Sequence, residues 1–186
     1  SGNILGDEQT GQANEIGVSL YQEMLQKTIN SLKLNKNDTN YSNLEENWSP
    51  VIRIPVTARI PENYIKDSAL RLNFYRRLSN YESQMQLESL LAELIDRFGK
   101  IPKDVINLAN ILKIKEKCKS LAIESLEVGT KGITFKFREG KVENISGLLA
   151  FIESDKSNIK PFNEKLFIKT KKGNSLNISY NVLKNM

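Results

Sequence analysis

The sequence predicts an α+β fold in which a helical N-terminal appendage is followed by helices packed on a small, mostly antiparallel sheet. Two patterns of apolar residues predict this class. Between residues 67 and 120 apolar residues recur every three or four positions, which is the spacing of a buried helix face. Between residues 123 and 137 they recur every second position, as they do on a strand. Helices and strands in separate parts of a chain are typical of α+β domains.

Composition divides the chain into three segments. Residues 1–34 begin with a glycine-rich loop and continue as one long helix, whose apolar residues keep helical spacing from about Ala13 onward. Residues 35–50 contain five asparagines and no periodic pattern, so we expect an exposed linker. Residues 51–186 are expected to form a C-terminal domain.

The first elements of that domain are marked by proline, by helix caps and by glycine. Residues 51–56 alternate like a strand, and Pro55 places this strand at a sheet edge because proline cannot donate to the ladder. Asp67 is a suitable N-cap for the next helix. A second helix runs from about Ser83 to Phe98, and Gly99 supplies the conformation that ends it.

A third helix, over about residues 103–120, carries apolar residues on two sides, so we expect it to lie between layers. Residues 129–132 contain two glycines and join two alternating segments, which indicates a β-hairpin. The remaining expected elements are a short helix near residues 145–152, a strand at residues 166–168 and a weak last helix over residues 177–186.

Composition also excludes several classes of function. The chain has no histidine and one cysteine, which removes histidine-dependent nucleophiles, zincin-type metal sites and internal disulfides. No window approaches the 18 apolar residues of a membrane span. The net charge of +5 comes from 27 basic and 22 acidic residues, and because the bases are scattered we interpret them mainly as solvated surface.

Three short motifs are interpreted as chance matches. Gly6 and Gly11 have the spacing of a phosphate-binding loop, but Gln12 and Ala13 stand where that loop needs lysine and serine or threonine. Residues 157–160 fit a Ser-x-x-Lys pattern without its companion motifs. Cys118 follows two lysines, yet its place on an apolar stripe favours an inert core thiol.

One charged cluster remains as a candidate site. If the leucines of the second helix face inward, Glu93, Asp96 and Arg97 project together on the opposite side. The simpler interpretation is a surface pair between Glu93 and Arg97, which contributes only about 0.3 to 0.5 kcal/mol. Periodicity alone favours that simpler interpretation.

Two blocks of the sequence resemble the transcription-repair coupling factor family. The N-terminal block resembles the segment that closes the translocase module of that family, and the C-terminal block resembles the beginning of its C-terminal domain. The residues that carry the resemblance are Ser1–Gly11, Ile16-Gly17, Leu20-Tyr21 and Leu25 in the N-terminal block, and Tyr64-Ile65, Arg71-Leu72, Phe74–Arg77, Glu93–Gly99 and Pro102 in the C-terminal block.

The resemblance implies that residues 1–34 are the tail of a DNA-translocating motor and that residues 51–186 are a non-catalytic regulatory domain. In this family the C-terminal domain docks on an N-terminal module similar to the excision nuclease's B subunit. The docked state masks the surface that recruits the excision-repair damage-recognition ATPase. By this resemblance Glu93, Asp96 and Arg97 lie in the motif that makes the contact.

The resemblance also implies the wider setting. The parent protein is expected to be a cytoplasmic bacterial motor that uses ATP and magnesium outside this segment, binds DNA and displaces stalled RNA polymerase. This segment itself is expected to need no cofactor, metal or membrane. A basic nucleic-acid-binding module is the alternative, because the net charge is positive and the segment from Lys113 to Lys119 contains four lysines. A stand-alone enzyme is the least favoured interpretation.

Overall fold

The structure, a computed structural model, describes residues 48–170 and 175–186. The predicted loop and long helix of residues 1–34, and most of the predicted linker, lie outside the described residues. The described chain forms two compact units. Unit 1 contains residues 56–109, and unit 2 contains residues 48–55 together with the described residues from Asn110 onward, so the boundary falls within one helix.

Unit 1 is helical, as the pattern of residues 67–120 predicts. Asp67 caps α2 by accepting a hydrogen bond from the Leu70 amide at 2.7 Å. Ser83 caps α3 in the same way, through the Gln86 amide at 3.2 Å. The elements are α2 (Ser68–Ser79), α3 (Gln84–Phe98) and the first turns of α4 (Lys103–Ser120).

The core of unit 1 lies between α2 and α3. Tyr64 fixes the end of α3, because its hydroxyl donates to the carbonyls of Leu94, at 2.9 Å, and Gly99, at 3.0 Å. Gly99 has φ 84° and ψ −158°, a backbone conformation that favours glycine and ends the helix as predicted. The buried apolar side chains here include Phe74, Leu78, Leu87, Leu90 and Leu94.

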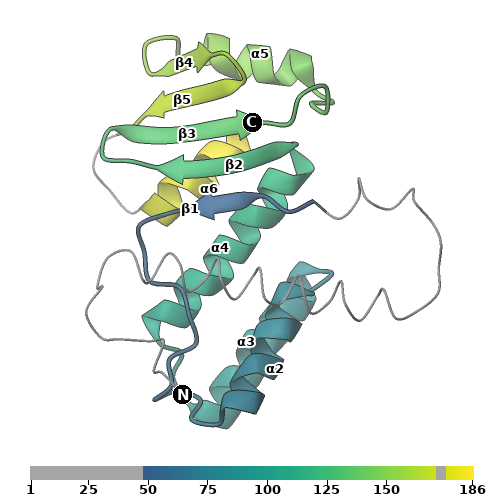
Figure 1. Cartoon of the computed structure of the whole chain (residues 1–186), viewed down its shortest axis with the longest axis vertical. Coiled ribbons are helices and arrows are strands. Elements are labelled where there is room, and N and C mark those ends of the chain that lie inside the picture. The colour runs from purple at the N-terminus through teal and green to yellow at the C-terminus, as the bar shows by residue number, and fades with distance from the viewer. Residues whose placement is uncertain (1–47, 171–174) are drawn as a thin grey trace, which may run out of the picture. The chain divides into compact units, whose positions relative to one another are not determined.

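Unit 2 is built on a five-stranded mixed sheet, so the predicted α+β class is confirmed (Figure 1). Its strand order is β1-β2-β3-β5-β4. β1 lies at one edge, as Pro55 predicts, and pairs in parallel with β2, whereas the other pairs are antiparallel. The strands are β1 (Val51–Arg53), β2 (Ile123–Val128), β3 (Gly132–Phe137), β4 (Ile159–Phe162) and β5 (Lys165–Lys169).

One face of this sheet forms the core of unit 2. The inward side chains of β2, β3 and β5 include Leu126, Phe135 and Leu166, each at most 2% exposed. In Figure 1, α6 (Ser175–Asn185) lies behind the strands, and its Leu183 is fully buried. Among the described helices of unit 2, none lies in front of the strands in this view.

In unit 2 one predicted helix is confirmed and one strand was not predicted. The predicted short helix is present as α5 (Ile145–Ser154), but none of its residues is buried among those described, and Ile145 and Leu149 are 60% and 56% exposed. β4 was not predicted, because Pro161 and the polar residues before it obscure the alternation. Its partner β5 extends the predicted strand by one residue at each end.

Trp48 anchors the beginning of the described chain to unit 2. The guanidinium carbon of Arg138 lies 4.4 Å from the centre of the Trp48 ring system, which is the geometry of a cation–π contact. The polar stretch before β1 therefore ends in a specific contact with the residue that follows β3.

Candidate functional site

The three charged residues that the sequence singles out all lie on α3, away from its buried leucines. Asp96 and Arg97 are exposed, and Glu93 is half-buried beside α2. The predicted outer patch is therefore present as a surface of unit 1. The three residues differ in their surroundings, however, and this difference decides what each of them can do.

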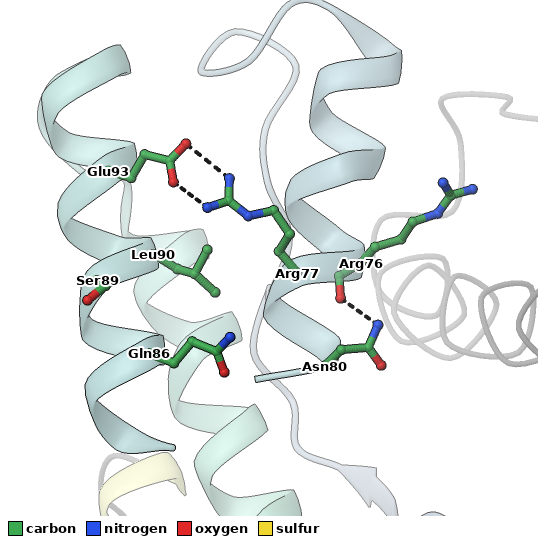
Figure 2. Close-up of a pocket in the computed structure, with 7 residues that line it drawn as sticks. All are labelled: Arg76, Arg77, Asn80, Gln86, Ser89, Leu90 and Glu93. Atoms are coloured by element: carbon green, nitrogen blue, oxygen red, sulfur yellow. Dashed lines mark hydrogen bonds and ion pairs between the residues drawn. The ribbon is translucent and has the colours of Figure 1, made fainter. Parts of the chain in front are cut away.

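Glu93 is the centre of an ion-pair network rather than a free surface charge. Arg97 donates from Nη1 to Glu93 Oε1 at 2.9 Å, which is the i,i+4 pair of the simpler interpretation. Arg77, on α2, donates from Nη1 to the same oxygen at 3.0 Å and from Nη2 to Oε2 (Figure 2). The Glu93 carboxylate therefore accepts three hydrogen bonds from two guanidinium groups, which leaves it little capacity for a further donor.

These hydrogen bonds fix the charge state of the network. The pKa of Glu93 falls from 4.5 to about 2, chiefly because Arg77 donates to the carboxylate and secondly because Arg97 does so. The same contact raises the pKa of Arg77. Glu93 is consequently ionised at any pH near neutrality, and the network carries one negative and two positive charges.

The two guanidinium groups also lie against aromatic rings. Arg77 is 5.0 Å from the centre of the Phe74 ring, and Arg97 is 5.5 Å from Phe74 and 5.2 Å from Phe98. Phe74 and Phe98 pack edge to face at 5.8 Å. Each arginine is therefore held by an aromatic ring as well as by Glu93, so its position on the surface is defined before any partner arrives.

Asp96 is the free member of the predicted cluster. Its side chain is exposed, and within the described residues it makes no hydrogen bond or ion pair. It lies three residues after Glu93, close to the same helix face. A basic group of a partner could therefore approach Asp96 without displacing an internal contact.

A shallow surface pocket of about 360 Å³ lies beside this network, between α2 and α3. Arg77 and Glu93 form part of its wall, whereas the side chain of Arg76 points away from Glu93 (Figure 2). The pocket is lined by Arg76, Arg77, Asn80, Gln86, Ser89, Leu90 and Glu93.

The role of Arg77 is not predicted by its sequence context. The pair between Arg77 and Glu93 joins residues that are 16 positions apart on different helices, and periodicity within one helix carries no signal for it. Its only trace in the sequence is its place among the residues that carry the family resemblance. The ion-pair network of Arg77, Glu93 and Arg97 is therefore visible only in the three-dimensional structure.

Two of the other sequence motifs lie within the described residues. The Ser157 hydroxyl donates a hydrogen bond to the Asp155 carboxylate at 2.8 Å in an exposed turn. This local hydrogen bond gives the serine a structural role in the turn. Burial raises the pKa of the Cys118 thiol to about 12. Among the described residues there is no group of three potential metal ligands. The glycine-rich segment Gly6–Ala13 lies outside the described residues.

None of the helices in residues 48–170 and 175–186 combines the length and the apolar character that a membrane span requires.

Comparison with known proteins identifies the family. The sequence profile of the TRCF domain matches residues 54–148, which is more than half of the chain. The chain is 38% identical over 177 residues to the transcription-repair-coupling factor of Rickettsia bellii (strain RML369-C), covering 94% of this chain and 15% of that protein. It is 31% identical over 153 residues to the Escherichia coli (strain K12) transcription-repair-coupling factor, covering 82% of this chain and 13% of that protein.

A solved structure agrees with the fold. The crystal structure of a C-terminal domain of transcription-repair coupling factor matches with a TM-score of 0.63 and 19% identity, covering 74% of this chain and 89% of that one. The chain spans about 15% of the length of the Rickettsia relative, so it corresponds to a small part of such proteins. On the profile match and these relatives, the chain belongs to the transcription-repair coupling factor family and carries its TRCF domain.

Proposed function

We propose that this domain is a regulatory docking module, which binds the excision-nuclease-B-like N-terminal module of its own parent protein through α3. In the docked state it masks the surface that recruits the excision-repair damage-recognition ATPase. The parent is proposed to be a cytoplasmic ATP-dependent DNA translocase that displaces stalled RNA polymerase. In this proposal the domain contributes binding and no chemistry, so ATP and magnesium belong to the motor.

The observation that supports this function best is the fixed charge pattern on α3. The network of Arg77, Glu93 and Arg97 holds two guanidinium groups in defined positions, and Asp96 stands beside it without an internal partner. A preformed pattern lowers the entropy that a partner must overcome when it orders the interface. The surface can therefore recognise one orientation of a charged partner.

The exposure of these groups suits a contact that must be released. Asp96 and Arg97 are exposed in the isolated domain, so an interface built on them keeps access to water at its rim. Charge pairs of this kind contribute to orientation and to the association rate more than to raw affinity. A docking contact of moderate strength can be broken when the motor changes conformation.

The residues of the network have different proposed roles. Asp96 makes the direct contact with a basic group of the N-terminal module, and Arg97 offers its remaining N–H donors to an acidic group. Glu93 positions Arg97 and Arg77, because its own acceptor sites are mostly occupied.

Titration of this chain with the separately expressed N-terminal module tests the proposal. The variant Asp96→Lys is expected to weaken binding by at least tenfold, roughly 1.4 kcal/mol, because the favourable pair becomes repulsive. The control Glu139→Lys reverses an exposed acidic residue of unit 2 and is expected to bind like the unmodified chain. Unchanged binding by Asp96→Lys, or equal losses in both variants, would show that α3 is not the docking surface.

A further inference from the structure

The sheet of unit 2 has another face, opposite to its buried core. Alternation along each strand places every second residue of β4 and β5 on that face. The register pairs Lys160 with Phe167 and Phe162 with Lys165, so lysine and phenylalanine stand side by side across the two strands. We call these residues the lysine–phenylalanine face; they are Lys160 and Phe162 of β4 and Lys165, Phe167 and Lys169 of β5.

This face is open among the described residues. Phe162 is 71% exposed, although phenylalanine normally lies inside a fold, and Lys160, Lys165 and Lys169 are all exposed. The opposite face of these strands carries the core residues, so the exposed ring of Phe162 is not required to build that core.

The other ring of the face, Phe167, extends across the neighbouring strand. A side-chain carbon added to Gly132 of β3 would meet the Cζ atom of Phe167 at 2.9 Å, closer than such atoms approach. The Ile168 carbonyl oxygen of β5 would lie closer still, so Gly132 is needed for the close approach of both the β5 backbone and the Phe167 ring.

The positive charge of the face is not balanced by neighbouring acids. Toward β1 and β2 the basic residues form ion pairs: Lys136 with Glu124 at 3.0 Å, and Arg53 with Glu127 at 3.9 Å. At β4 and β5 no ion pair forms, within the described chain, with any of the lysines Lys160, Lys165 and Lys169. The pKa of Lys136 on β3 is raised chiefly by its hydrogen bond to Glu124, and Glu164, in the turn between β4 and β5, adds to this effect.

The edge of β4 is poorly suited to an added peptide strand. Pro161 has no N–H, and the N–H of Ile159 already donates to the Asp155 carbonyl at 2.9 Å. An extended peptide that pairs with an edge strand needs free backbone donors there. The open surface of the sheet, rather than its edge, is therefore the part that can receive a partner.

We propose that the lysine–phenylalanine face binds single-stranded nucleic acid. The three lysines contact phosphates, and Phe162 and Phe167 stack on unpaired bases. The exposed ring of Phe162 and the half-buried ring of Phe167 alternate with lysines on this sheet surface. They supply the two contributions that single-strand binding uses, base stacking and phosphate neutralisation. Duplex DNA fits less well, because its base faces are already stacked. The inference concerns unit 2 and does not depend on the docking proposal for α3.

Fluorescence anisotropy of the full chain with a labelled oligothymidylate of about 15 nucleotides tests this inference. Binding is expected at low salt and is expected to weaken between roughly 50 and 200 mM salt. The variant K160Q/K165Q/K169Q removes three phosphate contacts and is expected to reduce the slope of log affinity against log salt by about 2. The control K113Q/K117Q/K119Q removes the same charge from α4 and is expected to keep the slope.

The variant Phe162→Ala tests stacking separately. Because the Phe162 ring is exposed, the melting temperature of the variant is expected to match that of the unmodified chain. The affinity of the variant for the oligonucleotide is expected to fall about tenfold. A duplex of the same length is expected to compete weakly. Three results would each overturn the inference: no binding at low salt, equal losses in the two lysine variants, or a dimer of the chain that Phe162→Ala dissociates.

Discussion

Arg77 on α2 donates hydrogen bonds from both of its terminal guanidinium nitrogens to the two carboxylate oxygens of Glu93 on α3. This bidentate pair joins two helices of unit 1 at the place where the docking surface is proposed. The same carboxylate orients Arg97, so one acidic residue controls the position of two cations. The stability of the helix pair and the form of the charged surface are therefore linked through Glu93.

A double-mutant cycle of Arg77→Ala and Glu93→Ala is expected to give a coupling energy of about 1 kcal/mol. The value is modest because both side chains are partly exposed, at 40% and 30%. Arg77→Ala alone is expected to cost more than the coupling, since it also removes the contact with the Phe74 ring. Urea denaturation of the four proteins measures these free energies of unfolding.

Arg76→Ala is the matched control for that cycle. Arg76 precedes Arg77 on α2, is exposed and points away from Glu93 (Figure 2). Its removal is expected to change the free energy of unfolding by less than about 0.5 kcal/mol. A loss as large as that of Arg77→Ala would mean that the net charge of the helix, rather than the bidentate pair, stabilises this region.

The lowered pKa of Glu93 predicts a pH dependence with a definite sign. Its pKa in the folded protein is about 2, below its usual value of 4.5, so the folded state favours the ionised form. The stabilisation is complete above about pH 4.5 and is lost as the pH falls toward about 2. Glu93→Gln cannot ionise, so the difference in unfolding free energy between the two proteins is expected to shrink over that interval. A difference that stays constant below about pH 4.5 would contradict the network.

Most helices of the described chain could be predicted because their signals are local. Asp67 and Ser83 each accept a hydrogen bond from an amide three residues ahead, so the caps are visible in the sequence next to the apolar stripe they begin. The hairpin of β2 and β3 is equally local, since the Gly129 amide donates to the Gly132 carbonyl at 2.9 Å. In these elements, the residues that determine the structure are neighbours along the chain.

The features that could not be predicted depend on residues far apart in the sequence. Arg77 finds Glu93 only when α2 and α3 pack together, and helix periodicity places each residue on a face without naming its partner. β4 depends on its pairing with β5 and contains Pro161, a residue type that is rare inside strands. The apolar residues of α5 predicted a helix, which is present, but Ile145 and Leu149 are exposed, because periodicity shows that a face is apolar and not what covers it.

Gly99→Ala is expected to destabilise unit 1 by roughly 1 to 3 kcal/mol. Gly99 has a φ of 84°, which a residue with a side chain adopts only under strain, although open space surrounds the added carbon. Gly129→Ala is the control, because its new carbon would lie 3.8 Å from the Gly132 carbonyl oxygen, an ordinary contact, and its φ is not in the strained range. Thermal unfolding of both variants separates backbone strain from the simple addition of a methyl group. Equal melting temperatures would show that α3 can end without a glycine.

Cys118 is expected to be unreactive in the folded protein. Its thiol is fully buried on α4, and burial raises its pKa to about 12, so the thiolate fraction near pH 8 is on the order of one in ten thousand. Because the chain has a single cysteine, the release of thionitrobenzoate from a disulfide reagent reports this residue alone. Reaction is expected to be slow without denaturant and complete in urea, where α4 unfolds and the thiol regains its ordinary acidity. Rapid stoichiometric reaction of the native chain would contradict the packing of the apolar stripe of α4 that includes Ile111, Ile114 and Cys118.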